Sequence, residues 1–284
     1  MSPANYTPTW PLPVNEHLVG RMPWLAVDGD DWHLAFSTRE GALAIGEDAE
    51  AGPEIGLNMG FSAADTAAAA AAVRNNRGLF CAVLGIDAAT LVVPGQVHGT
   101  RLALVGPADK GRGAGSRSTV IPDTDGLITS SPKLPLVVSF ADCVPVLIVG
   151  RNSAGQRVLA LVHAGWRGML AGIVGQAAKL LAAIGELEAA VVGPSIGPCC
   201  FSVDRELATQ FATRFGSAVV EKRERQTYVD LWACAATELL SAGLPEERLT
   251  NPHLCTSSDQ RFYSHRRDQG HTGRHIAIAW IDGS

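Results

Sequence analysis

Two apolar stretches, LPLVVSFADCVPVLIVG (residues 134–150) and RVLALVHAGWRG (residues 157–168), dominate the middle of the chain. Both are rich in β-branched residues and are too continuously apolar for a sheet with one face in water, so they predict strands buried on both faces. Neither has the roughly 20 apolar residues that a membrane-spanning helix needs. The two stretches therefore predict the centre of a buried sheet.

Helix and strand patterns alternate on both sides of this centre. The patterns predict helices over residues 62–85, 168–185, 203–215 and 228–243, and further strands over 91–106 (two strands, broken at 94–99), 189–197 and 274–282. This alternation predicts an α/β or mixed α+β fold with a buried sheet layer. We expect one domain over residues 1–284, with an N-terminal extension at 1–25 and a mobile, Gly-, Arg- and Ser-rich loop at 106–124.

Composition argues against several classes of protein. A net charge of −5 and a pI of about 5.9 give no basic surface for binding nucleic acid. The first residues, MSPANYTPTWPLPVNEHL, lack the pattern of a signal peptide, so we expect a cytoplasmic protein without a membrane segment. The six scattered cysteines favour reduced thiols, and the adjacent Cys199 and Cys200 are typical of small buried residues rather than a redox pair.

Three residues that bind metals well lie at or near the ends of predicted strands. They are His98 in PGQVHGT, Cys143 in SFADCVPV and His163 in LVHAGWRG. Strand ends are where α/β folds gather their chemistry, and two imidazoles with one thiolate suit a tetrahedral zinc site whose fourth position is open to water. Because separations of 45 and 20 residues (143 − 98 and 163 − 143) are not those of a metal finger, a purely structural role for all three stays open.

Six ordered motifs make the chain resemble the YfiH/YlmD-type proteins. The motifs are QVHGT, ADCVPVLI, VHAGWRG, GPSIGPCCF, DLWA and RFYSHRRDQGHTGR, and the resemblance runs from about Phe36 to Ile281. Members of that family are described variously as polyphenol oxidase (laccase)-like proteins, peptidoglycan editing factors and purine nucleoside phosphorylases. The resemblance implies a single-domain, layered α/β/β/α sandwich with mixed buried sheets, related to the catalytic domain of the cytotoxic necrotizing factors.

The resemblance also implies a zinc enzyme that acts on nucleosides. The family's zinc ligands correspond to His98, Cys143 and His163, which implies one Zn²⁺ per chain and a catalytic role for the three residues. The implied activities are phosphorolysis of adenosine, inosine, guanosine and methylthioadenosine, with phosphate as co-substrate, and hydrolytic deamination of adenosine. Zinc lowers the pKa of bound water to about 7, which suits attack on C6 of adenine.

Phosphate binding needs cations with forked donors, which arginine supplies. Arg39 in FSTREG and Arg77 in RNNRG match arginine positions of the family, and together with Asn58 they are the expected substrate-binding residues. An ordinary surface role is the alternative for each arginine, because most arginines are exposed. Arg266 and Arg267 belong to another family motif without an assigned role.

The chain departs from the family on the substrate side. EIGLNMGF stands where members commonly read NLGLHVGD, which changes Glu54, Asn58 and Phe61. Ser202 replaces a glutamate and Ala235 an asparagine. Since the zinc ligands are intact, the resemblance transfers the metal site better than the nucleoside specificity.

The sequence also bears on three functions other than a zinc-dependent nucleoside enzyme. Multicopper laccase chemistry needs about ten histidines in His-x-His pairs, whereas this chain has eight histidines and no such pair. A cysteine hydrolase or peptidoglycan-editing factor would use Cys143 with His163 or His98 as a nucleophile and base. A binding protein without turnover is the third alternative, because the substrate-side loops have changed.

Overall fold

The first apolar stretch is divided between two sheets. It forms β6 (Leu136–Phe140) and β7 (Val144–Asn152), and the second stretch forms β8 (Arg157–Ala164). β7 and β8 pair antiparallel within a six-stranded sheet, whereas β6 is an edge strand of a five-stranded sheet. The chain therefore crosses between the sheets at residues 141–143, where Asp142 has a left-handed φ of 89°.

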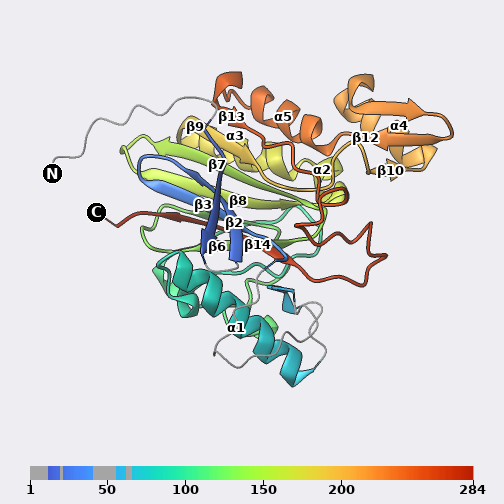
Figure 1. The fold of residues 1–284 in the computed structure, drawn as a ribbon. Coiled ribbons are helices and arrows are strands. Elements are labelled where there is room, and N and C mark those ends of the chain that lie inside the picture. Colours follow the sequence, from blue (N-terminus) through green and yellow to red (C-terminus); the bar gives the residue numbers. More distant parts are fainter. Residues whose placement is uncertain (1–11, 20–21, 41–55, 62–65, 284) are drawn as a thin grey trace.

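The computed structural model describes residues 12–19, 22–40, 56–61 and 66–283, which form a mixed α/β fold with three sheets (Figure 1). Strand orders are β1-β2-β3-β14-β6, β13-β9-β7-β8-β5-β4 and β10-β12-β11. The other strands are β1 (Asn15–Val19), β2 (Met22–Asp28), β3 (Trp32–Ser37), β4 (Leu102–Leu104), β5 (Gly126–Thr129), β9 (Gly185–Val192), β10 (Ser202–Val203), β11 (Val220–Arg223), β12 (Gln226–Val229), β13 (Leu249–Thr250) and β14 (His275–Ile281). The helices are α1 (Ala67–Val83), α2 (Trp166–Ala171), α3 (Ile173–Ile184), α4 (Arg205–Phe215) and α5 (Leu231–Ser241).

Side-chain alternation along β7 separates two cores. Val146 and Ile148 pack with apolar residues of the four helices α2 to α5, whereas Leu147 and Val149 pack with residues of the five-stranded sheet. A third core lies between the other face of the five-stranded sheet and α1. The layers are therefore helix, sheet, sheet and helices, with α1 on one side and α2 to α5 on the other (Figure 1). The expected mixed α/β class is confirmed.

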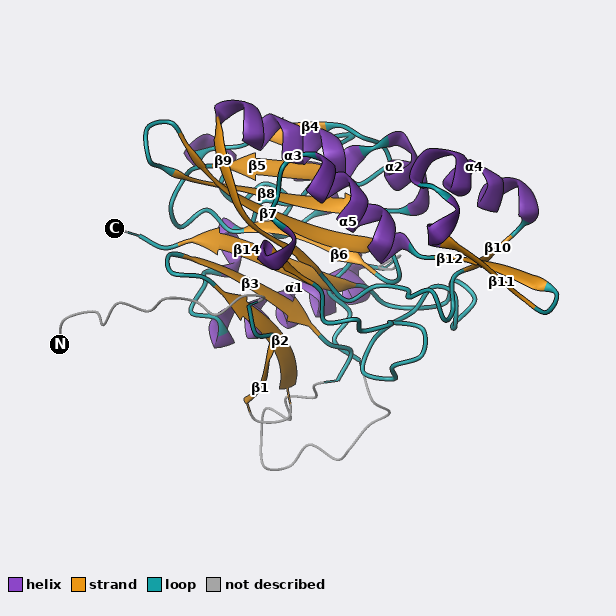
Figure 2. Ribbon diagram, turned by 90° about the horizontal axis from the view of Figure 1, so that it is seen from above, coloured by secondary structure: helices purple, strands orange, loops and turns teal. Residues whose placement is uncertain are grey.

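Some predicted elements differ in the structure. The helix expected over 168–185 is two helices, because Gly172 between them has a φ of 85° and a Cβ there would lie 2.4 Å from Arg214 Nη2. The segment 226–229 is strand β12 of a small sheet beside α4 (Figure 2), so the helix expected from 228 begins at Leu231, after its cap Asp230. No described helix is long and apolar enough to cross a membrane.

Two segments expected to lie outside the sheet core have defined contacts. Within the expected N-terminal extension, β1 and the start of β2 pair in the five-stranded sheet, and residues 1–11 and 20–21 are outside the described residues. The expected loop over 106–124 contains two short 3₁₀ turns, Pro107–Asp109 and Arg117–Thr119. Its mobility stays a prediction.

A fully buried histidine lies at the start of β14. His275 Nε2 accepts the backbone N–H of Tyr263, and its ring centroid lies 5.2 Å from that of Phe140 and 5.5 Å from that of Phe262. Burial lowers the pKa of His275 to about 3. The folded protein therefore holds this imidazole neutral, whereas the unfolded chain protonates it near the ordinary histidine pKa of 6.5.

We expect this histidine to make the fold acid-sensitive. Between about pH 6.5 and about pH 3 the unfolded state binds the additional proton, so the free energy of unfolding falls as pH falls through that window. From about pH 7 to about pH 5 the loss is about 2 kcal/mol. Thermal unfolding of the wild type and of His275→Gln, which keeps an acceptor for Tyr263, should show a shallower pH dependence in the variant; equal slopes would contradict this account.

Candidate active site

Strand pairing brings three polar residues to one end of the six-stranded sheet. Because β7 and β8 run antiparallel, the start of β7 lies beside the end of β8, and this places Cys143 next to His163. Asp125 directly precedes β5, which pairs with β8, and its carbonyl accepts the N–H of His163 at 2.7 Å. Three segments distant in sequence thus meet at one point.

The Asp125 carboxylate positions both histidines. It accepts the backbone N–H groups of Val97 (3.1 Å), His98 (2.9 Å) and Gly99 (2.8 Å), and Nδ1 of His163 lies 2.9 Å from its Oδ1. The side chain is fully buried. Although burial raises the pKa of Asp125, the hydrogen bond and charge of His163 and the N–H donors outweigh it and lower the pKa. Asp125 is therefore a carboxylate, and Nε2 of His163 is left to face a ligand.

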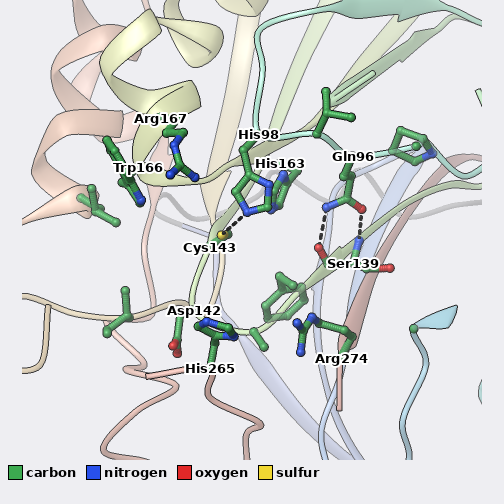
Figure 3. A pocket seen from close by; sticks show the side chains of 18 of the residues that line it. Gln96, His98, Ser139, Asp142, Cys143, His163, Trp166, Arg167, His265 and Arg274 are labelled. Atoms are coloured by element: carbon green, nitrogen blue, oxygen red, sulfur yellow. Dashed lines mark hydrogen bonds between the residues drawn. The ribbon is translucent and has the colours of Figure 1, made fainter. Parts of the chain in front are cut away.

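The predicted trio is assembled (Figure 3). One ligand atom from each of His98, Cys143 and His163 lies within 4.8 Å of the others. Cys143 Sγ is 3.8 Å from His98 Nε2, and the two imidazole centroids are 4.9 Å apart at 85°. Gly165 makes this approach feasible, because a Cβ there would lie 2.8 Å from His98 Cδ2 and 3.2 Å from Cys143 Sγ.

Charge within the trio favours the thiolate. Burial raises the pKa of Cys143, but the imidazoles of His163 and His98 outweigh burial and bring it to about 6. Burial lowers the pKa of His163, yet the Cys143 sulfur and Asp125 together raise it to about 9. The ligand-free site is thus a thiolate beside an imidazolium, and a bound metal would take the place of that proton.

The donor set fits a divalent metal of borderline softness. Sulfur and nitrogen bound to one tetrahedral zinc, at about 2.3 and 2.0 Å, lie about 3.6 Å apart. The separation of 3.8 Å between Cys143 Sγ and His98 Nε2 is close to that value. Three protein ligands leave one coordination position open, as in catalytic zinc sites.

A cavity of about 840 Å³ lies in front of the trio, a size suited to a small organic ligand. Trp166 and Arg167 stand on one side of the trio, and Gln96 and Arg274 on the other (Figure 3). Five arginines of the described residues line the cavity: Arg77, Arg117, Arg167, Arg266 and Arg274. The cavity therefore combines the His98, Cys143 and His163 trio, an aromatic ring and positive charge.

Two lining arginines are well placed to bind an anion. Arg167 is exposed and lies 4.4 Å over the Trp166 ring, and no hydrogen bond or ion pair joins it to another described residue. Arg274 is half-buried, and its Nη1 donates to the carbonyls of Thr272 and Gly273. Burial lowers the pKa of Arg274, with the negative charge of Cys143 opposing that effect.

Arg77, one of the expected substrate residues, is buried at the cavity wall and bonds to the backbone of two neighbouring segments. Its Nε donates to Met59 O at 2.8 Å, and its Nη1 donates to Gly113 O and Ala114 O. Its guanidinium carbon lies 4.6 Å from the centroid of the Phe61 ring. Most of its donors therefore join α1 to neighbouring loops, although it lines the cavity.

The other two expected substrate residues stand behind the cavity lining. Asn58 Oδ1 accepts the backbone N–H groups of Gly60 and Arg274, so Asn58 positions an arginine that does line the cavity. Arg39 lies over the Tyr263 ring, 5.8 Å from its centroid, and is not among the cavity residues. Substrate binding by Arg39, Arg77 and Asn58 stays a prediction.

The positions that depart from the family lie in different surroundings. Phe61 and Ser202 line the cavity, and Ser202 accepts a hydrogen bond from Arg266 Nη1 at 3.0 Å. Ala235 is buried in the helical core. Glu54 lies outside the described residues. The changes that face the cavity are therefore Phe61 and Ser202.

Sequence reasoning missed three residues that build the site, Asp125, Asp142 and Arg274. Asp142 is buried, and its oxygens accept from Thr256 Oγ1 and from the backbone N–H of Arg266, each at 2.6 Å. The available signal was a carboxylate one or two residues before an apolar strand: Asp125 in TDG directly precedes β5, and Asp142 in ADC is separated from β7 by Cys143. Such a carboxylate must be satisfied by nearby N–H or O–H groups.

Comparison with known proteins places the chain among relatives along most of its length. Residues 33–282 match the family model described as "Multi-copper polyphenol oxidoreductase laccase". The purine nucleoside phosphorylase YlmD of Geobacillus stearothermophilus is 36% identical over 236 residues, covering 80% of this chain and 84% of that protein. The purine nucleoside phosphorylase of Xylella fastidiosa (strain 9a5c) is 31% identical over 273 residues, covering 93% and 99%.

Solved structures resemble the fold closely. The crystal structure of YlmD from Geobacillus stearothermophilus superposes with a TM-score of 0.82 at 31% identity, covering 95% of this chain and 100% of that one. That of the Bacillus licheniformis hypothetical protein YfiH gives 0.79 at 28% identity, covering 93% and 97%.

Replacing the Asp125 carboxylate should weaken metal binding without removing a ligand. In Asp125→Asn one carboxylate oxygen becomes an amide NH₂, which cannot accept the N–H groups that this oxygen accepts in the wild type. We therefore expect the affinity for Zn²⁺ to fall about 10- to 100-fold. Competition with a chromophoric zinc chelator measures this. Asp123→Asn, a nearby cavity residue outside the trio's hydrogen bonds, is the control; equal losses in both variants would contradict the positioning role.

Proposed function

This chain belongs to the multi-copper polyphenol oxidoreductase laccase family, and from that membership we propose that it is a purine nucleoside phosphorylase. The observation that carries the proposal is the cavity, which sets His98, Cys143 and His163 beside arginine side chains, Arg167 among them, and an aromatic ring. Relatives named as purine nucleoside phosphorylases cover most of the chain. Nucleoside and phosphate are the proposed small-molecule partners.

The cavity offers separate partners for the two substrates. The exposed guanidinium of Arg167 and the half-buried guanidinium of Arg274 can donate paired hydrogen bonds to the oxygens of inorganic phosphate. Trp166 and Phe61 offer rings to a purine. In phosphorolysis a phosphate oxygen attacks ribose C1′ as the N9–C1′ bond breaks, and the bonding electrons leave with the purine, which takes up a proton.

We assign one Zn²⁺ per chain to His98, Cys143 and His163, since their geometry and the thiolate at Cys143 suit that ion. Bound zinc would supply a Lewis acid and an activated water at the cavity. Asp125 holds the two histidines in position, and Gly165 leaves the space for the three side chains to converge.

Adenosine deamination extends the proposal. The cavity that holds the purine also faces the open side of the trio, so water could reach C6, form the new C–O bond and release ammonia. Multicopper chemistry, which the family's description mentions, finds little support here: the trio contains two histidines, and the chain has no His-x-His pair.

The phosphorylase proposal predicts that hypoxanthine is released from inosine only when phosphate is present. Chromatography of the bases measures this release. In Arg167→Ala we expect KM for phosphate to rise about tenfold or more, because a charged hydrogen-bond donor is lost, while zinc content is unchanged. Arg225→Ala, an exposed arginine in the turn between β11 and β12, is the control. Base release that does not depend on phosphate would overturn the proposal.

A cysteine hydrolase is the second candidate. The 3.8 Å contact of Cys143 with His98 and the lowered pKa of the thiol fit a nucleophile with its base. Such chemistry would also suit the predicted relationship to the cytotoxic necrotizing factor domain and the peptidoglycan-editing description. It needs no metal, and this distinguishes it from the phosphorylase.

Removal of the metal separates the two candidates. We expect chelation to abolish activity and added Zn²⁺ to restore it, and we expect Cys143→Ala to lose activity and zinc together while the far-ultraviolet circular dichroism spectrum is kept. Leu104→Ala, at an exposed position outside the cavity, serves as the control. Full activity in the zinc-free wild type would favour the hydrolase.

A further inference from the structure

Three cysteines form a second cluster, apart from the trio. The sulfur atoms of Cys199, Cys200 and Cys255 lie within 4.8 Å of one another, and those of Cys199 and Cys200 are 3.4 Å apart. The cluster contains no histidine or carboxylate from the described part of the chain. Cys255 is buried, Cys200 half-buried and Cys199 exposed, so the cluster is anchored in the protein and open to solvent on one side.

The backbone around these thiols is held in place by its own contacts. Ser195 and Cys255 form a parallel bridge between two segments, and the N–H of Gly197 donates to Cys255 Sγ at 3.2 Å. A Cβ on Gly197 would lie 2.6 Å from the Trp232 ring, and Trp232 Nε1 donates to Ser195 Oγ at 2.7 Å. The two segments that carry the cysteines are therefore fixed relative to each other.

We infer that Cys199, Cys200 and Cys255 form a binding site for one thiophilic metal ion, best suited to Cu(I). Three sulfurs about 2.3 Å from one ion in a trigonal plane lie about 4 Å apart, within the spacing of this cluster. Thiolates without hard oxygen ligands select soft ions such as Cu(I). The N–H donor from Gly197 stabilises negative charge on the buried sulfur.

The cluster is connected to the cavity through the turn that bears it. Arg266 Nη1 donates to Cys200 O at 3.2 Å and to Ser202 O at 2.9 Å, and the guanidinium lies 5.3 Å from the Phe201 ring centroid. Arg266, Phe201 and Ser202 all line the cavity. An ion on the cysteines would therefore fix the turn that holds part of the cavity wall.

A Cu(I) titration tests the site in the full chain, with Cys143→Ser as background so that the trio lacks its thiolate. Reduced protein is titrated without oxygen against a chromophoric Cu(I) chelator. We expect one tight equivalent, an affinity loss of at least about 100-fold on adding Cys255→Ser, and no loss on adding Cys234→Ser, a buried cysteine of α5 outside the cluster. The exposed Cys199→Ser repeats the test if Cys255→Ser does not fold.

Two further readouts accompany the titration. Cu(I) should raise the Tm only where all three cysteines are present, because an ion that binds the folded state alone stabilises it. X-ray absorption should find three sulfur neighbours. Equal affinity in the Cys255→Ser and Cys234→Ser proteins, or two sulfur neighbours as in a site made by Cys199 and Cys200 alone, would overturn the inference. Reduced protein that binds no Cu(I) would do so as well.

Discussion

One buried carboxylate organises the candidate active site. Asp125 has no access to solvent, and a buried charge is tolerated only when hydrogen-bond donors surround it. The donors are three consecutive backbone N–H groups, 97 to 99, and the imidazole of His163. Satisfying the charge fixes the backbone of His98, whose φ of 63° is itself uncommon. The requirement of a single side chain thus sets the relative position of two histidines, His98 and His163, from distant parts of the chain.

The second determinant is the crossing of the chain between the two sheets. Residues 141–143 leave one sheet and enter the other, and Asp142 has a left-handed backbone conformation there. The Asp142 carboxylate accepts hydrogen bonds from the Thr256 hydroxyl and from the backbone N–H of Arg266. Cys143 is presented at this crossing. Cys143 therefore lies where the two sheets meet, whereas the positions that depart from the family and face the cavity, Phe61 and Ser202, lie on its walls.

Period and composition were sufficient to predict the buried strands and most helices, because these leave local signals: continuous β-branched runs and helical spacing. They place His98, Cys143 and His163 at or near strand ends, but only the resemblance to the family implied that the three act together. The division of residues 134–150 between two sheets leaves no local signal, since both strands are equally apolar. The break at Gly172 follows from its left-handed φ of 85°, which a glycine inside a helical pattern permits but does not require. Arg77 and Asn58 bond to backbone groups that face them only after folding, which no local pattern predicts, and their substrate binding stays a prediction.

The connection between β4 and β5 carries a consequence for how such proteins diversify. These parallel neighbours are joined by residues 105–125, and this crossover supplies Gly113, Arg117, Val120 and Asp123 to the cavity wall. Its two ends are fixed by the sheet, and bridges at Gly113 and Ile121 hold it to Val92 and Pro94, whereas residues 114–120 between these bridges pair with no strand. Insertions or deletions between these bridges can therefore reshape the cavity while His98, Cys143 and His163 stay in place, so the cavity wall and the trio can vary separately under selection.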